Sequence, residues 1–592
     1  MSTQLRVFLS LLGAFVVALY LFFVGTPLEV DTLYVNGKIY TMDNDNTVVD
    51  ALAVRGEWIA AVGSRSDLEQ RVRFRRVVDL AGKTVLPGFI DGHAHLLSLG
   101  LARLTLDLVG TQSEQEVVAR VRARVATSEP GQWVRGRGWD QNLWPKKRFP
   151  TTSALDAVSP ENPVYLTRID GHAVWVNRRA LEIAGVTSET PDPPGGRILR
   201  DSKGNPTGVF IDAAMQLITD HLPSLSEKEA EQALELAIQE CLSYGLTSVH
   251  DMGVSNSEIK LYRRLIDEGR FPFRVYAAVD GEGETWNTVL QTGALVNYRR
   301  KLSVRAIKLY IDGALGSRGA ALIEPYSDDP ANRGLTLMSD EDLKRVVGDA
   351  LNGGFQVCTH AIGDRGNNIV LNAYEAALRE NRVKDHRLRI EHAQVLHPND
   401  IPRFSQLGVI PSMQPTHCTS DMFWAESRLG PERVHGAYAW RSLLNTGVII
   451  CGGSDFPVEH PNPLAGIYAA ITRRDQRGIP RNADDVKRFF QLSEHGIVDP
   501  KAFDGGWYPD QRMNRVEAIR AFTSWAAFAA FEEELKGTLK RGKLADFLIL
   551  SHDPFEVSGE LLLTTRVETT ILGGEVVYQL EEVRSASSSQ IR

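Results

Sequence analysis

Cysteine is scarce in this sequence, with only four among 592 residues, and no two of them form a Cys-x-x-Cys pair. This scarcity excludes a disulfide-rich scaffold and the common cysteine-based zinc patterns. Cys358 and Cys451 lie inside apolar runs, which favours a role as small buried hydrophobic residues. An excess of positive charge is also absent. Because the formal net charge is -8, nothing in the composition predicts a nucleic-acid-binding surface.

Long hydrophobic runs are rare as well, and one stands out near the N-terminus. Val7 to Gly25 contains no charged residue and follows Arg6. A bilayer-spanning helix needs about 20 apolar residues, whereas the apolar core of a cleaved signal peptide has about 7–15. We therefore expect residues 1–30 to be a single-pass transmembrane anchor, with the rest of the chain outside the cytoplasm, in the periplasm or a lumen. A long signal peptide that is removed is the alternative, and it also predicts export.

The remaining chain has an ordinary globular composition, 43% hydrophobic and 24% charged, and its length allows a large core. Strand-like apolar runs alternate with amphipathic helical stretches, a pattern typical of parallel sheets. Eight such runs predict an α/β fold of the (β/α)8 TIM-barrel type over residues 85–536. The interval after the first run is too long for one helix, so we predict an insertion at about 111–221. The eight runs are Val85–Asp91, Leu246–His250, Phe273–Val279, Val304–Asp312, Phe355–His360, Leu388–His392, Val409–Gln414 and Val448–Asp455.

Both flanks of this predicted barrel have a β pattern. Residues 31–84 contain short alternating runs, with Asn36-Gly37 as a hairpin signal. Residues 537–582 contain a strand at Phe547 to Leu550 and two more around Gly573-Gly574. We expect the two flanks to meet in one small β-sandwich, although they are far apart in the sequence. The Ser-rich polar tail, 583–592, is expected to be disordered.

Histidines occur where the predicted barrel strands end. The first run leads into Asp-Gly-His-Ala-His, and in an extended chain its two histidines, His93 and His95, point to the same face. His360 and His392 end two later runs, and Asp455 follows the last one. TIM barrels build their sites at the C-terminal ends of the strands, and imidazole is a common metal ligand. The recurrence therefore predicts a metal site, whereas a structural role in capping a strand or helix is the alternative for each residue.

The fourth predicted strand carries a lysine on its inward face. Period two places Lys308, Tyr310 and Asp312 on one face, and Ile307 and Leu309 on the face toward the helices. A buried lysine is rarely unpaired. Its ammonium group cannot bind a metal, so Lys308 becomes a ligand only after it reacts with CO₂ to form a carbamate that bridges two ions. A salt bridge from Lys308 to Asp312 or another barrel carboxylate is the alternative.

The order His-x-His, lysine, histidine, histidine and aspartate along the predicted strands resembles the amidohydrolase superfamily. Five phrases are similar to its branch of N-substituted formamide deformylase-like proteins: Pro-Gly-Phe-Ile-Asp-Gly-His-Ala-His, Ile-Lys-Leu-Tyr-Ile-Asp-Gly-Ala-Leu-Gly-Ser, Thr-His-Ala-Ile-Gly-Asp, Glu-His-Ala-Gln and Gly-Gly-Ser-Asp-Phe-Pro-Val. The similarity extends from Thr32 to Tyr578. It implies the barrel fold, metal dependence and hydrolysis of C–N bonds in amides and cyclic ureides.

The resemblance also implies a role for each candidate residue. Asp455 accepts a proton from the attacking water and passes it to the leaving nitrogen. The implied metal site holds two divalent ions, which we expect to be Zn²⁺, with the more buried ion bound by His93, His95 and Asp455, the second by His360 and His392, and both bridged by carboxylated Lys308.

Three further residues are expected to contact a small-molecule substrate. His172 lies in the predicted insertion, and Arg318 and His417 follow the fourth and seventh strands. An ordinary loop role is the alternative for each of them. The sequence also leaves two alternative functions open, namely a deaminase of a heterocycle and a non-catalytic, membrane-tethered binding protein that retains the barrel. A homodimer is a further open possibility.

Overall fold

The computed structural model describes residues 27–381, 383–492 and 499–583, and these form two compact units. The smaller unit contains residues 27–88, 532–553 and 566–583, and the larger unit contains residues 89–531 and 554–565. The predicted membrane segment, Val7 to Gly25, and nearly all of the predicted tail lie outside the described residues. Within the described ranges, no helix combines the length and the apolar character that crossing a bilayer requires.

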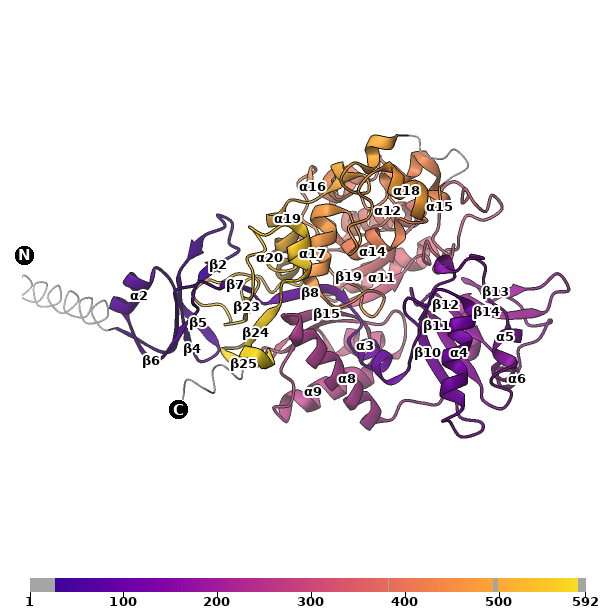
Figure 1. The fold of residues 1–592 in the computed structure, drawn as a ribbon, viewed down its shortest axis with the longest axis horizontal. Coiled ribbons are helices and arrows are strands. Elements are labelled where there is room, and N and C mark those ends of the chain that lie inside the picture. The colour runs from indigo at the N-terminus through magenta and orange to yellow at the C-terminus, as the bar shows by residue number, and fades with distance from the viewer. Residues whose placement is uncertain (1–26, 382, 493–498, 584–592) are drawn as a thin grey trace, which may run out of the picture. The chain divides into compact units, whose positions relative to one another are not determined.

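The smaller unit is built from both ends of the chain and contains two sheets, with strand orders β5-β4-β1-β6 and β25-β24-β23-β7-β2-β3 (Figure 1). Antiparallel pairing of β23 with β7 joins Phe547 to Pro87. Leu52 from one sheet and Ile39 and Ile571 from the other share one apolar core. The elements are β1 (Leu28–Val35), β2 (Lys38–Tyr40), β3 (Val48–Val49), β4 (Ala51–Arg55), β5 (Trp58–Gly63), α2 (Arg65–Arg71), β6 (Val72–Asp79), β7 (Thr84–Pro87), β23 (Phe547–Leu550), β24 (Val567–Leu572) and β25 (Glu575–Gln579).

The predicted hairpin at Asn36-Gly37 is wrong. β1 pairs with β4 and β6, whereas β2 pairs with β3 and β7, so this turn carries the chain from one sheet to the other. Asn36 has the positive φ, 58°, that Asn-Gly turns favour. The Asn-Gly sequence therefore forms the expected turn, but it does not determine which strands pair. Val85 to Pro87, predicted as the start of the first barrel strand, likewise belong to β7 of the smaller unit.

The larger unit contains eight parallel strands in the order β8-β15-β16-β18-β19-β20-β21-β22, which confirms the predicted barrel. A parallel bridge between Ala94 and Phe456 links the first strand to the segment after the last, so the barrel is nearly closed. β17 (Leu295–Tyr298) pairs with β18 outside this path. The barrel strands are β8 (Phe89–Ala94), β15 (Leu246–Val254), β16 (Arg274–Val279), β18 (Leu302–Tyr310), β19 (Gln356–Ala361), β20 (Arg389–His392), β21 (Ile410–Met413) and β22 (Cys451–Gly452).

Amphipathic helices follow the strands, and α8 shows how the sequence forms them. Ser226 and Glu229 make a capping box that fixes the start of the helix. Buried residues then recur at helical spacing, from Ala233 to Leu242. The helices are α3 (Leu96–Leu104), α8 (Glu227–Ser243), α9 (Asn256–Asp267), α10 (Glu284–Thr292), α11 (Asp340–Asn352), α12 (Asp364–Glu380), α13 (Ile401–Leu407), α14 (Pro415–Asp421), α15 (Ala425–Arg433), α16 (Trp440–Leu444), α17 (Pro463–Thr472), α18 (Ala483–Phe489), α19 (Arg515–Ala521), α20 (Ser524–Ala529) and α21 (Gly559–Leu563).

The barrel interior changes from apolar to polar along the strands. Ala306 of β18 and Cys358 of β19 belong to a buried cluster with Tyr276 of β16. Because side chains of a strand alternate between its faces, the next inward residues on β18 and β19 are Lys308 and His360. An apolar layer therefore supports a polar layer at the C-terminal ends of the strands.

The insertion after α3 folds into a six-stranded sheet with the order β13-β14-β12-β11-β10-β9 (Figure 1). Successive residues of β12 enter two different cores, with Ala173 and Trp175 in one and Val174 and Val176 in the other. Both faces of this sheet are therefore covered. Its elements are β9 (Leu106–Asp107), α4 (Glu114–Val125), β10 (Val134–Trp139), α5 (Thr152–Asp156), β11 (Val164–Arg168), β12 (Ala173–Val176), α6 (Arg178–Ala184), β13 (Gly196–Arg200), β14 (Pro206–Asp212) and α7 (Gln216–Thr219).

Candidate active site

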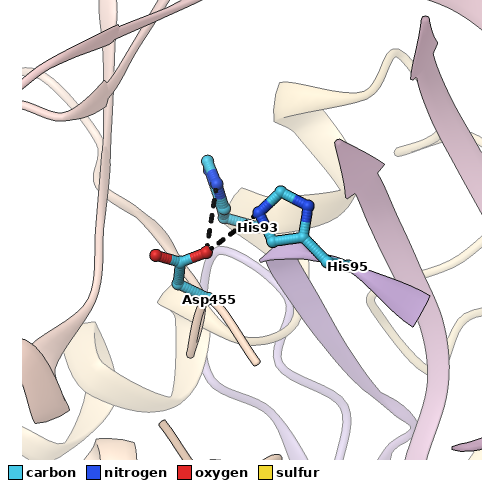
Figure 2. A group of neighbouring side chains, drawn as sticks. All are labelled: His93, His95 and Asp455. Carbon is cyan, nitrogen blue, oxygen red and sulfur yellow. Dashed lines mark ion pairs between the residues drawn. The ribbon is translucent and has the colours of Figure 1, made fainter. Parts of the chain in front are cut away.

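Two histidines at the end of β8 converge on the aspartate that follows β22. Nε2 of His95 lies 3.1 Å from Oδ1 of Asp455, and Nε2 of His93 lies 3.5 Å from the same oxygen. Figure 2 shows both imidazoles pointing toward this carboxylate. The structure therefore brings Asp455 next to two histidines that lie about 360 residues earlier in the chain.

The other ring nitrogen of each histidine is held by an acceptor. Nδ1 of His93 lies 2.6 Å from Oε2 of Glu391, and Nδ1 of His95 lies 2.9 Å from the carbonyl oxygen of Met252. Because a carboxylate and a carbonyl only accept hydrogen bonds, Nδ1 must carry the proton in both rings. Burial, with a contribution from Lys308, also lowers the pKa of His93 to about 4, so this ring is neutral. In a neutral ring the lone pair of Nε2 is then available to a metal ion.

A buried ion pair lies beneath His93. Arg389 donates from Nε to Oε1 of Glu391 at 2.8 Å and from Nη2 to Oε2 at 3.0 Å. Burial alone raises the pKa of Glu391, but Arg389 and His93 hold it well below its ordinary range. Arg389 also donates to the Gly92 carbonyl oxygen at 2.6 Å and to Oγ of Ser412 at 3.0 Å. The sequence did not predict this ion pair. Its only sign there is that the Arg-Ile-Glu-His segment places two charged residues inside an apolar stretch.

A second group of ligand atoms comes from His392, His417 and Asp455, which lie within 4.8 Å of one another. Nδ1 of His392 lies 2.8 Å from Oε1 of Gln414. The ring of His360 is centred 4.7 Å from that of His392, and its Nε2 lies 3.6 Å from Oδ1 of Asp312. Nε2 of His360 and Nε2 of His417 are both buried, and neither has a hydrogen-bond partner among the described residues. A buried nitrogen without a hydrogen-bond partner destabilises the folded protein by about 1–3 kcal/mol. A bound cation would remove this cost, so the site suits a cation.

Lys308 reaches the same site, because its Nζ lies 3.2 Å from Nε2 of His93. The side chain is 1% exposed, and within the described chain no carboxylate oxygen lies within 4.0 Å of Nζ. The alternative salt bridge to Asp312 is not formed. Asp312 instead accepts hydrogen bonds from the backbone N–H groups of Ala321, Ile362 and Gly363. Burial lowers the pKa of Lys308, although Glu391 and Asp455 act in the opposite direction.

Two cavities, of about 440 and 410 Å³, open beside these residues. His360, His392 and Asp455 line both of them. His172 from the insertion also lines both, and its Nδ1 lies 2.7 Å from Oδ1 of Asp212, a partner that the sequence did not indicate. Burial alone lowers the pKa of His172, but Asp212 raises it to about 9.

Of the three residues predicted to contact substrate, two lie at the cavities and one does not. His172 and His417 line cavity walls. Arg318 follows β18, but its Nε and Nη2 lie 3.2 and 2.9 Å from the carboxylate of Asp328. Arg318 is not among the described residues that line either cavity.

Strained backbone marks three residues of the site. The φ angles of His392, Asp455 and Asp212 are 72°, 60° and 50°. Residues other than glycine rarely adopt such angles, and they tend to occur where function requires a particular side-chain direction. In a regular strand, the side chains of Glu391 and His392 would point to opposite faces. The positive φ at His392 lets both point into the barrel.

The fold and the histidine–carboxylate site define a barrel hydrolase of the metal-dependent type. Comparison with known proteins identifies the family, because residues 76–578 match the sequence profile described as Amidohydrolase family. The chain belongs to this family, and it is an enzyme that acts on C–N bonds other than peptide bonds. The predicted resemblance is confirmed.

Individual relatives cover most of the chain. It is 36% identical over 568 residues to Protein LONG AFTER FAR-RED 3 of Arabidopsis thaliana, covering 93% of this chain and 91% of that protein. It is 28% identical over 572 residues to N-substituted formamide deformylase of Arthrobacter pascens, covering 93% and 98%. A solved structure, an uncharacterized metal-dependent hydrolase from Pyrococcus horikoshii, superposes with a TM-score of 0.69 at 27% identity, covering 89% and 99%.

The hydrogen bond between Gln414 and His392 provides a test of this geometry. Gln414→Met removes the acceptor for Nδ1 while retaining the size of the side chain. We expect the affinity for zinc at the His392 side of the site to fall about 10–100-fold, as other losses of such support do. Zinc titration followed by calorimetry measures the change.

Gln394→Met is the matched control. Gln394 is also a buried glutamine near the end of β20, but its Nε2 donates to Asp421 and Tyr438 and not to a histidine. The control variant should bind zinc as the wild type does. Equal zinc affinity in both variants would contradict the assigned role of Gln414.

Proposed function

We propose that this enzyme hydrolyses an amide or related C–N bond in a small molecule. The substrate classes that we propose are N-substituted formamides, N-acyl compounds and cyclic amides. The main observation in support of this proposal is that His93 and His95 converge on one oxygen of Asp455 beside two cavities. The name of the Arthrobacter pascens relative supports the choice of formamides.

The proposed site holds two divalent ions, Zn²⁺ in our proposal. Its residues suit such ions because Nδ1 protonation leaves Nε2 of His93, His95 and His392 available. When bound, the ions lower the pKa of a coordinated water toward about 7 and polarise the substrate carbonyl. The proposed ligands are His93, His95, carboxylated Lys308, His360, His392 and Asp455.

Asp455 is the proposed proton carrier. Burial alone raises the pKa of Asp455, but positive charge on His93, His95 and His392, or on the cations that would take the place of their protons, holds it well below its ordinary range, so the carboxylate is ionised at neutral pH. It accepts the proton that the attacking water loses as the C–O bond forms. It then donates this proton to the nitrogen as the C–N bond breaks, so the amine leaves uncharged. We assign substrate contact to His172, which Asp212 orients beside both cavities.

A product screen tests this function. Purified full-length protein, loaded with zinc, is incubated with N-substituted formamides, N-acyl amines, cyclic amides and amino-substituted heterocycles. We expect release of an amine and a carboxylic acid from at least one amide class. Release of ammonia from a heterocycle, without amide hydrolysis, would contradict the proposal in favour of a deaminase.

Lys308 offers a test of the two-ion site. Its neutral amine attacks the carbon of CO₂, so an N–C bond forms while one C=O π bond opens onto its oxygen, and the nitrogen passes a proton to water, which leaves an anionic carbamate. This anion would attract two cations, whereas a free ammonium group would repel them at the low effective dielectric of the interior. Lys308→Ala should therefore lose one of two zinc ions per chain and most turnover, and acetate or propionate should restore part of the rate.

Lys308→Arg is the control for charge, because an arginine retains the positive charge and forms no carbamate. We expect it to lose the second ion and to show no rescue by acetate. Zinc content by mass spectrometry and a ¹³C NMR carbamate signal after exposure to ¹³CO₂ are the readouts. An amine without this signal, together with one ion in the wild type, would contradict the bridge.

We also propose that the first 30 or so residues anchor the enzyme in a membrane, with the barrel outside the cytoplasm. The uncharged run from Val7 to Gly25 behind Arg6 supports this proposal. Protease added to intact spheroplasts should digest the barrel, whereas a cytosolic marker protein should survive. Recovery of the full-length chain in the soluble cytosolic fraction would be the contrary result. The homodimer stays a prediction.

A further inference from the structure

His417 is a buried histidine whose ring stacks on that of His392 at the edge of the site. It lies on α14 directly after β21 and is 9% exposed. Its Nε2 is buried and has no hydrogen-bond partner in the described part of the chain. The resemblance to the family implies no metal at this position.

The two oxygens of Asp455 face different histidines. Oδ1 lies 3.1 Å from Nε2 of His95 and 3.5 Å from Nε2 of His93. Oδ2 lies 3.6 Å from Nε2 of His417, on the other side of the carboxylate. This separation exceeds the length of a hydrogen bond, so Asp455 does not satisfy the nitrogen directly.

The 3.6 Å between Nε2 of His417 and Oδ2 of Asp455 is suitable for two ligand atoms of one metal ion. With metal–ligand distances of about 2.0–2.1 Å in a tetrahedron, ligand atoms lie about 3.3 Å apart. The distances from Asp455 to all three histidines are close to this value. Asp455 therefore has the geometry of a bridge between two cation sites, one on each oxygen.

His392 supplies the third ligand on the His417 side. Its ring stacks on that of His417, with centroids 5.7 Å apart and planes inclined by 16°. Because Nδ1 of His392 is held by Gln414, its Nε2 faces the group. The ligand atoms of His392, His417 and Asp455 lie within 4.8 Å of one another, as do those of His93, His95 and Asp455. Nε2 of His360, by contrast, lies 3.6 Å from Asp312 and outside both groups.

We propose that His417 is a ligand of the second ion, with His392 and Oδ2 of Asp455, and that Asp455 bridges the two ions. This inference rests on the proposed two-ion site. It adds His417 to the proposed ligands, among which His360 remains, and it changes the role of His417 from the predicted substrate contact to metal binding. It also gives α14 a function, since this helix then carries a metal ligand on the wall of the smaller cavity.

Metal content tests the inference independently of activity. Full-length wild type and variants are dialysed against the same limiting Zn²⁺ and analysed by mass spectrometry. We expect two ions in the wild type and one in His417→Ala, with unchanged circular dichroism. His417→Glu, which restores a ligand, should regain the second ion. Two ions in His417→Ala at wild-type affinity, or only one in the wild type, would overturn the inference.

Thr419→Ala is the matched control, because Thr419 lies on α14 and lines the same cavity but offers no ligand group comparable to imidazole. It should keep two ions. If His417→Ala fails to fold, anomalous scattering from crystals of zinc-loaded wild type shows whether an ion lies at His417. An ion within about 2.3 Å of Nε2 of His417 supports the inference. Ions that all lie well beyond that distance overturn it.

The outcome is separable from that of the proposed function. A wild type that binds two ions through His417 but hydrolyses no amide would contradict the function and leave the inference standing. An active amide hydrolase whose His417→Ala variant keeps both ions would contradict only the inference.

Discussion

The active site depends on the buried ion pair between Arg389 and Glu391. Arg389 has four partners inside the barrel, since it also contacts Nδ1 of His250 at 2.9 Å. These contacts reach β8, β15, β20 and β21, so one guanidinium joins four of the eight strands beneath the ligands. Removal of either charge would leave the other buried without its partner, at a cost of about 3–5 kcal/mol. The orientation of His93 follows from this pair through Glu391.

The barrel and its insertion contribute different parts of the site. The barrel strands supply the histidines and aspartate that face each other over an apolar layer, which fixes the reacting centre. The insertion supplies His172, held by Asp212, to the walls of both cavities. Differences in the insertion can therefore alter which substrate fits while the ligand geometry stays the same.

Much of the fold and the site followed from the sequence because period two is a strong constraint. The alternation in β18 placed Lys308 inward, and the eight runs gave the barrel. Other features depend on contacts between distant residues. Glu391 and His392 both face inward only because φ at His392 is 72°, and no pattern in the sequence indicates that angle. The pairing of Arg318 with Asp328 and the pairing of strands around Asn36-Gly37 also depend on tertiary structure, so sequence analysis could not assign them.

The position of His417 illustrates the same limit. Its place after the seventh strand indicated the open end of the barrel, which is where it lies. The sequence could not show that its Nε2 faces the oxygen of Asp455 that His93 and His95 leave free. That distinction separates a residue that contacts substrate from one that binds a metal.

Zinc titration of metal-free protein tests whether this site hydrolyses C–N bonds through bound metal. Release of amine from an amide substrate is followed while zinc is added in known molar ratio. We expect no turnover without metal and a rate that reaches its maximum at two ions per chain. Turnover that is unchanged by complete removal of metal would contradict it.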